Sequence, residues 1–234
     1  GHYLLESLPL LWTMEEGFSF KLAFFPWKKT IDAYLLGMIA PFGLASEDIC
    51  ITEEFSLIKT LYLIRRPYMI KSYASNKIRS VYKKVATYYH GKDTALPKRI
   101  YVSRRKVAKR MLINESACEE VFASYGFTSV CPEMLSFPDQ VRLFSNATHI
   151  AGPVGSALHN VVFSLRPEEM KVLFLTPERF PPEDFCQVEQ LYGRTPMCVY
   201  GKYASAVSRE TWYKSPWSIS IDNLKKAIEQ WLAF

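Results

Sequence analysis

The sequence lacks the cysteine spacings that hold structural zinc or a secreted disulfide framework. Its cysteines are odd in number and widely scattered, with no C-x-x-C pair. Zinc sites need closely spaced thiolates, and small secreted scaffolds carry an even set of cysteines. We therefore expect no zinc site, and free thiols in a reducing compartment. The cysteines are Cys50, Cys118, Cys131, Cys186 and Cys198.

Long apolar runs and a secretory leader are also missing. No uninterrupted apolar stretch reaches the roughly 20 residues that a helix needs to cross a bilayer. No signal-peptide pattern is visible at the start. The chain begins with Gly1-His2 inside an apolar pattern, so we expect a fragment of a longer protein.

The common nucleotide and metal motifs are absent as well. Neither G-x-G-x-x-G nor G-x-x-x-x-G-K-[ST] occurs, which excludes the dinucleotide and P-loop fingerprints. There is no D-x-D, and the paired carboxylates Glu15-Glu16 and Glu53-Glu54 have no neighbouring His or Asp. A diphosphate site that depends on a bound metal is therefore not favoured, and we expect neither a metal nor another cofactor.

The composition is that of a globular protein with a mild basic excess. The 234 residues are 49% hydrophobic and 22% charged, with a formal net charge of +6. Such a charge suits a phosphate-bearing ligand, a nucleic acid or an anionic membrane surface. The basic residues form no dense stripe with aromatics, which makes nucleic acid the weakest of the three alternatives.

Apolar periodicity divides the sequence into two parts joined by a polar stretch at 90–99, which we expect to be a linker. Pro9 should break the first helix because it has no N–H donor. Before the linker we expect helices at 2–12, 30–42 and 72–89 and strands at 19–25 and 48–64.

From residue 99 onward, short apolar strands alternate with helices, which predicts a doubly wound parallel sheet. Asn114 and Ser136 are expected to cap helices, and a final helix should begin at Asp222. We divide the chain into domains at 1–92 and 93–234, and we allow the final helix to pack back on the first domain.

The stretch "AGPVGSALHN" at 151–160 places a glycine turn between an apolar strand and a helix. Backbone N–H groups at such a helix start can hold a phosphate, although Gly152 and Gly155 could equally serve only a tight turn. Arg104 and Arg105 directly follow another strand. If both strands lie in one parallel sheet, the arginines reach the same edge as the turn and can bind a diphosphate.

Two other positions could supply acid–base chemistry. His2 and Glu6 are spaced i, i+4, so a helix would place them on one face as a possible general-base pair. An exposed pair on a surface helix is the alternative. His149 and His159 are more typical of core or surface histidines than of catalysts.

Three stretches together resemble glycosyltransferase family 61. They are "GHYLLESLPLLW" (1–12), "RIYVSRRKVAKRMLINE" (99–115) and "GFTSVCPEMLSFPDQVRLFSNATHIAGPVGSALHNVVF" (126–163). The family typically shows a His and an acidic residue near the start, a strand ending in Ser-Arg-Arg, an Asn-Glu, a Gln and a glycine turn. The resemblance runs from residue 1 to about 165.

The resemblance implies a GT-B architecture: two Rossmann-like domains whose parallel sheets face a cleft, the first of them truncated here. It implies an inverting, metal-independent transfer from a nucleotide-sugar to a hydroxyl of a glycan or glycolipid, with Glu6 or His2 as the acceptor base. The donor-binding residues carried over by position are Arg104, Arg105, Arg110, Asn114, Glu115, Gln140, Gly152, Gly155, Ser156, Ala157 and Asn160.

The sequence departs from the family pattern at one position, because Val154 stands where the turn usually carries His. Two alternatives therefore stay open beside a bacterial enzyme of polysaccharide or capsule assembly. One is a degenerate member that binds a glycan or partner without turnover, and the other is a relative of the secretory pathway. The free cysteines favour the cytoplasm, with peripheral association at the inner membrane face. Sequons at Asn114 and Asn146 would suit the endoplasmic reticulum or Golgi lumen, but both asparagines fit structural roles better.

Overall fold

A six-stranded sheet forms the centre of the second half of the chain. The computed structural model describes residues 3–24, 32–51, 57–91, 96–107, 109–208, 211 and 214–233. The strand order is β10-β9-β8-β7-β5-β6, and all neighbours are parallel except β10, which is antiparallel to β9. The prediction of an α/β fold with a mostly parallel sheet is confirmed. The strands are β5 Arg99–Val102, β6 Thr128–Val130, β7 His149–Pro153, β8 Lys171–Pro177, β9 Met197–Tyr203 and β10 Trp217–Ser218.

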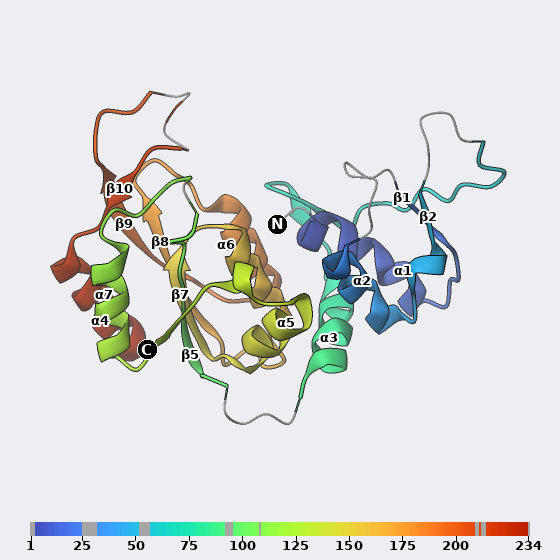
Figure 1. The fold of residues 1–234 in the computed structure, drawn as a ribbon, viewed down its shortest axis with the longest axis horizontal. Helices are drawn as coiled ribbons and strands as arrows, with labels where there is room; N and C mark the ends of the chain where they lie inside the picture. The colour runs from blue at the N-terminus through green and yellow to red at the C-terminus, as the bar shows by residue number, and fades with distance from the viewer. Residues whose placement is uncertain are drawn as a thin grey trace.

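Helices cover both faces of this sheet (Figure 1). Successive side chains of a strand point to opposite faces, so Ile100 and Val102 enter one apolar cluster and Tyr101 enters the other. On the first face lie α5 Phe137–Asn146, the 3-10 helix η6 Ser156–Phe163 and α6 Glu183–Leu191. On the second face lie α4 Glu115–Ser124 and α7 Ile221–Ala233.

The first half of the chain is mainly helical, with two small sheets. Strands β1 and β2 pair in parallel across α2, so they form a single β-α-β unit, and β3 and β4 form a hairpin. Among the described residues before 92 no sheet is larger than these pairs, and the strand expected over 48–64 is limited to β2. The elements are η1 Tyr3–Ser7, η2 Leu8–Leu11, α1 Trp12–Glu15, β1 Leu22–Phe24, α2 Ala33–Ile39, η3 Ala40–Phe42, η4 Ser46–Asp48, β2 Ile49–Ile51, β3 Tyr68–Met69, β4 Tyr73–Ala74 and α3 Ile78–Tyr89.

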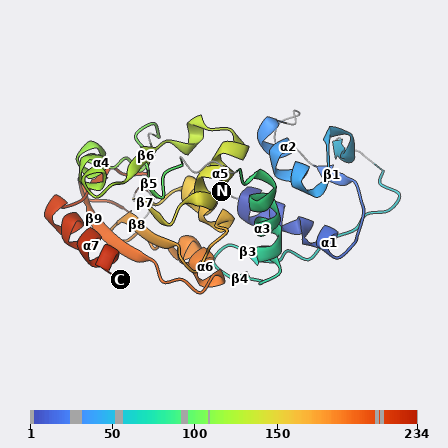
Figure 2. The same cartoon turned by 90° about the horizontal axis from the view of Figure 1, so that it is seen from below.

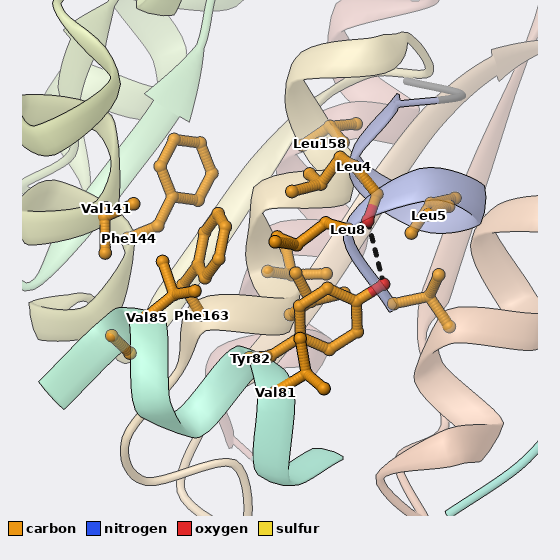
Figure 3. Packing of buried hydrophobic residues seen from close by; sticks show 14 of the residues in the cluster. Leu4, Leu5, Leu8, Val81, Tyr82, Val85, Val141, Phe144, Leu158 and Phe163 are labelled. Atoms are coloured by element: carbon orange, nitrogen blue, oxygen red, sulfur yellow. Dashed lines mark hydrogen bonds between the residues drawn. The ribbon is translucent and has the colours of Figure 1, made fainter. Parts of the chain in front are cut away.

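The two halves share one hydrophobic core. Helix α3 presents an apolar face that includes Val81 and Val85, and this face packs on α5 and η6 of the second half. The Tyr82 ring lies edge-on to Phe163 with centroids 6.0 Å apart, and its hydroxyl donates a hydrogen bond of 3.0 Å to the Leu4 carbonyl (Figure 3). Helix η1 also contacts η6, the helix that follows the glycine turn. The domain boundary at 92/93 stays a prediction.

Local signals were correct at some helix ends and wrong at others. The Ser136 hydroxyl accepts from the Asp139 N–H at the start of α5, as predicted. Asn114 does not cap α4 with its side chain. Its amide instead pairs with Ile219, donating to the carbonyl at 2.8 Å and accepting from the N–H at 3.2 Å.

The last helix packs on the second half of the chain. The Trp231 ring of α7 stacks on Phe127 with centroids 5.7 Å apart, and Leu224 and Ile228 enter the cluster on the α4 face. Figure 2 shows α7 at the end of the molecule opposite α1 and β1. Among the described residues, none of the helices has both the length and the apolar character that a bilayer crossing needs.

Both glycosylation sequons have structural roles, as expected. Asn146 is buried, and its amide donates to the Leu96 carbonyl at 2.9 Å while its oxygen accepts from the Lys98 ammonium. With Asn114 held by Ile219, neither amide nitrogen is available in the folded chain.

The start of β7 gives the stability of the fold a pH dependence. Burial, with Arg99 and Lys171 nearby, lowers the pKa of His149 from 6.5 to about 4. As the pH falls, His149 therefore becomes protonated near pH 6.5 in the unfolded chain but only near pH 4 in the folded chain. The neutral His149 side chain makes its full contribution to the free energy of unfolding above pH 6.5, and this contribution is lost as the pH falls to about 4. We expect a loss on the order of 1–2 kcal/mol for the half-buried ring.

Chemical denaturation of wild type and His149→Gln at pH 7 and pH 4.5 measures this effect. The glutamine variant stays neutral, so its stability should change less between the two pH values. Equal changes in both proteins would contradict the assignment.

Candidate functional site

A large cavity adjoins the point where the strand order reverses. Its volume is about 690 Å³, and its walls include residues that follow β5 and β7. These strands are neighbours, but their chain connections leave the sheet in opposite directions, and in open α/β sheets this switch point is where ligands bind. The first half contributes Leu4 and Tyr34. The other lining residues are Ser103, Arg104, Val107, Lys109, Arg110, Pro132, Glu133, Gln140, Ser156, Ala157, Asn160 and Phe180.

Two guanidinium groups lie close together in this cavity. Burial and the charge of Arg110 both lower the pKa of Arg104, while Glu115 and Glu133 oppose this only in part. Burial also lowers the pKa of Arg110, whose guanidinium carbon lies 4.8 Å from the centroid of the Phe180 ring. Neither arginine forms an ion pair within the described part of the chain. An anion in the cavity would relieve this repulsion and restore both pKa values.

The loop that carries the arginines is fixed by contacts on its outer side. Glu115 is buried and accepts the Arg104 backbone N–H at 2.6 Å. The backbone of Arg110 has a φ of 55°, a left-handed conformation that costs a non-glycine residue about 1 kcal/mol. The Trp217 indole donates to the Arg110 carbonyl at 3.0 Å and holds it there. Asn114 and Glu115 therefore position the loop and do not line the cavity.

Because Gly152 and Gly155 have no side chain, strand β5 and the Arg104 guanidinium can lie close to the glycine turn. A Cβ on Gly152 would lie 2.5 Å from the Val102 carbonyl oxygen, and one on Gly155 would lie 1.9 Å from Nη1 of Arg104. Gly155 thus leaves the space in which the Arg104 guanidinium lies. The helix that follows the turn is η6, a 3-10 helix, and Val154 is buried in the core.

An amide pair lies at one side of the cavity. Asn160 donates to Oε1 of Gln140 at 3.1 Å, and Gln140 donates to the Pro132 carbonyl at 2.9 Å and the Leu135 carbonyl at 3.2 Å. Oδ1 of Asn160 is buried and has no hydrogen-bond partner among the described residues. A buried oxygen without a partner is costly, so a hydroxyl donor from a bound molecule would satisfy it.

The structure brings together most, but not all, of the predicted donor-binding residues. Six of them line the cavity: Arg104, Arg110, Gln140, Ser156, Ala157 and Asn160. Arg105 points elsewhere, to a salt bridge of 3.0 Å with Glu119 on α4. His2 lies outside the described residues. Glu6 does not line the cavity, although Leu4 of the same short helix does.

Eight of the lining residues were not predicted from the sequence, and three of them show why. Phe180 follows the end of β8, so the rule that ligands bind at strand ends could have found it. Lys109 belongs to the basic run at 104–110, in which the sequence alone does not distinguish a ligand-binding lysine from a solvent-exposed one. Tyr34 carries no sequence signal, because its position depends on how α2 packs on α5.

A second polar group lies between the halves. Nε2 of His159 is 3.8 Å from Oδ2 of Asp184, and the imidazole stacks on Phe185 with centroids 4.5 Å apart. His159 is buried, as expected of a core histidine. Burial of Tyr68, together with the charges of Asp184 and Glu6, raises the pKa of its hydroxyl. Glu6 therefore lies near this group.

In the described ranges, no three His, Cys, Asp or Glu side chains gather as metal ligands would.

Fold and cavity together define an α/β protein with a cavity at the switch point of its sheet, lined in part by two arginines. The sequence model of the family Glycosyltransferase 61 matches residues 1–173. The chain therefore belongs to glycosyltransferase family 61, and its class of activity is sugar transfer from a donor to an acceptor. No curated protein matches the chain.

Proposed function

We propose that the cavity holds the diphosphate of a nucleotide-sugar and that the protein transfers the sugar with inversion and without a metal. The observation that carries this proposal is the pair Arg104 and Arg110, two half-buried cations at the switch point of the sheet that form no ion pair among the described residues. The leaving diphosphate gains negative charge in the transition state. Two fixed guanidinium groups stabilise that charge, so no metal is required.

We further propose that the donor enters with its sugar toward the first half of the chain. The amide pair Gln140 and Asn160 would then meet hydroxyls of the donor, because Oδ1 of Asn160 needs a hydrogen-bond donor. Leu4 and Tyr34 line the cavity from the first half, which supports a GT-B-like arrangement. In it, residues 93–234 bind the donor and residues 1–92 form the acceptor side.

Glu6 is the proposed general base. The acceptor oxygen attacks the anomeric carbon from the face opposite the diphosphate, and the C–O bond to the diphosphate breaks with its electron pair. The acceptor proton passes to the Glu6 carboxylate. His2 is the alternative base. The acceptor is a hydroxyl of a glycan or glycolipid in polysaccharide or capsule assembly, at the cytoplasmic side of a membrane with which the protein associates peripherally.

A second candidate is a degenerate member that binds a glycan without turnover. Val154 favours it, since this position carries His in the family pattern but here enters the hydrophobic core. A secretory-pathway relative is less favoured, because the amides of both sequons are engaged.

Calorimetric titration with UDP, GDP, CDP and CMP, with and without Mg²⁺, tests the donor site. We expect one nucleotide to bind in the micromolar range and to do so equally well without the metal. Binding that requires Mg²⁺ would contradict the metal-independent mechanism. Binding by none of the nucleotides would favour the degenerate member.

Glu6→Gln should lower kcat about 10²- to 10⁴-fold, the usual contribution of a general base, while the nucleotide affinity stays unchanged. The measurement is the rate of turnover of the nucleotide-sugar that contains the nucleotide identified by the titration. Glu47→Gln removes an exposed carboxylate from the same half and is the matched control. Full activity of Glu6→Gln would shift the base role to His2, and His2→Gln would then be the variant without turnover.

A further inference from the structure

Positive charge is concentrated in one part of this chain. Between residues 55 and 92 the sequence has nine Lys and Arg and no Asp or Glu. The whole chain has a formal net charge of +6, so the remaining residues carry a net charge of −3. The basic excess of the protein therefore belongs to this stretch, which lies mostly outside the donor cavity.

Several of these cations have no counter-ion among the described residues. Lys71, Lys77 and Lys84 form salt bridges with acidic residues of other segments. The others in the described part of the stretch form none, and Arg65 and Arg66 are exposed side by side. The unpaired residues are Lys59, Arg65, Arg66, Arg79 and Lys83.

Exposed apolar side chains lie directly beside the unpaired arginines. Residues 57–66 have no regular secondary structure, and Leu57 and Leu63 have relative exposures of 102% and 88%. Leu61 and Tyr62 are exposed as well. In Figures 1 and 2 the teal trace between β2 and β3 reaches the end of the molecule far from the six-stranded sheet. Leucines exposed to this degree beside unpaired cations are typical of a surface that enters a lipid interface.

A cavity adjoins this segment where it meets α3. It has a volume of about 430 Å³ and is lined by Arg65, Arg66, Trp12 and Lys77, among others. The Lys77 ammonium lies 4.0 Å from the centroid of the Trp12 ring. The Trp12 indole N–H is buried and has no partner in the described part of the chain. Two guanidiniums and an unused N–H donor suit the phosphate of a lipid headgroup.

We propose that residues 57–66 bind an anionic membrane surface, with Leu57, Leu61, Tyr62 and Leu63 inserted among the headgroups and the cavity at Arg65 and Arg66 holding a lipid phosphate. The charge selects an anionic leaflet, and the exposed leucines select a membrane over a soluble polyanion, which offers no apolar phase. Residues 57–66 would be the surface through which the protein makes the peripheral membrane association proposed above. This inference does not depend on the nucleotide site.

Co-sedimentation of the full chain with lipid vesicles tests the proposal. We expect binding to equimolar phosphatidylglycerol and phosphatidylcholine, little binding to phosphatidylcholine alone, and weaker binding as salt rises. Arg65→Gln/Arg66→Gln should weaken binding to the anionic vesicles about 30-fold, from roughly 1 kcal/mol for each basic residue at such a surface. Leu61→Ser/Leu63→Ser should weaken it at least about tenfold.

The matched control is Lys225→Gln/Lys226→Gln, which removes two exposed charges from α7 and should leave vesicle binding unchanged. Nucleotide titration of every variant shows that the fold is intact and separates this proposal from the donor site. Three results would each overturn the proposal: no binding to anionic vesicles, equal binding to neutral vesicles, or loss in the arginine variant without loss in the leucine variant. The last would indicate a soluble polyanion.

Discussion

Arg104→Met should weaken binding of the nucleotide diphosphate about 100-fold and should not reduce the stability of the protein without ligand. A charge-assisted hydrogen bond contributes about 1.5–3 kcal/mol, so losing the guanidinium from the diphosphate has this order of effect. In the free protein, burial and Arg110 both oppose the charge of Arg104. Removing that charge therefore relieves repulsion, and the melting temperature should stay equal or rise.

The neighbouring residue gives a matched control for this prediction. Arg105 has the same charge and is one position further along the chain, but it pairs with Glu119 outside the cavity. Arg105→Met should leave the nucleotide affinity within about twofold of wild type, because it loses only an exposed ion pair. Calorimetry and thermal melts of both variants are the measurements. An equal loss of affinity in both would mean that the arginines act through general charge and not at the cavity.

The sequence could predict where the cavity of the candidate site lies, because that position follows from the topology of the sheet. Parallel strands place their carboxyl ends at one edge, so the residues after β5 and after β7 had to approach each other. Arg104 and Ser156 are at this edge for that reason. The sequence could not separate Arg104 from Arg105. Two successive residues after a strand point in different directions, and Glu119, on a separate helix, decides which one leaves the cavity.

The parts that could not be predicted depend on contacts between distant segments. Asn114 has the position and residue type of a helix cap, but its amide finds Ile219, 105 residues away. Tyr34 reaches the cavity because α2 packs on α5, and nothing local in the sequence marks that contact. The predicted parallel sheet of the first half is reduced to one β-α-β unit in the described residues, since the apolar residues of 57–63 stay exposed instead of pairing.

Gly155→Ala should weaken nucleotide binding at least about tenfold while changing the free energy of unfolding by less than about 1 kcal/mol. The backbone of Gly155 is extended, with a φ of 179°, which alanine adopts without strain. The new Cβ would lie 1.9 Å from Nη1 and 2.8 Å from Cζ of Arg104. The end of this side chain can move at little cost to folding, but it must then leave the position from which it meets the diphosphate.

Gly152→Ala provides the opposite case in the same turn. Its Cβ would meet the Val102 carbonyl at 2.5 Å, and this backbone atom is fixed in β5, so we expect a destabilisation of about 1–3 kcal/mol. The double variant Gly155→Ala/Arg104→Met identifies the route of the effect. Substitutions that act through one side chain are not additive, so the double variant should bind no more weakly than Arg104→Met alone. A further loss in the double variant would mean that Gly155 contacts the nucleotide through its own backbone and not only by leaving space for Arg104.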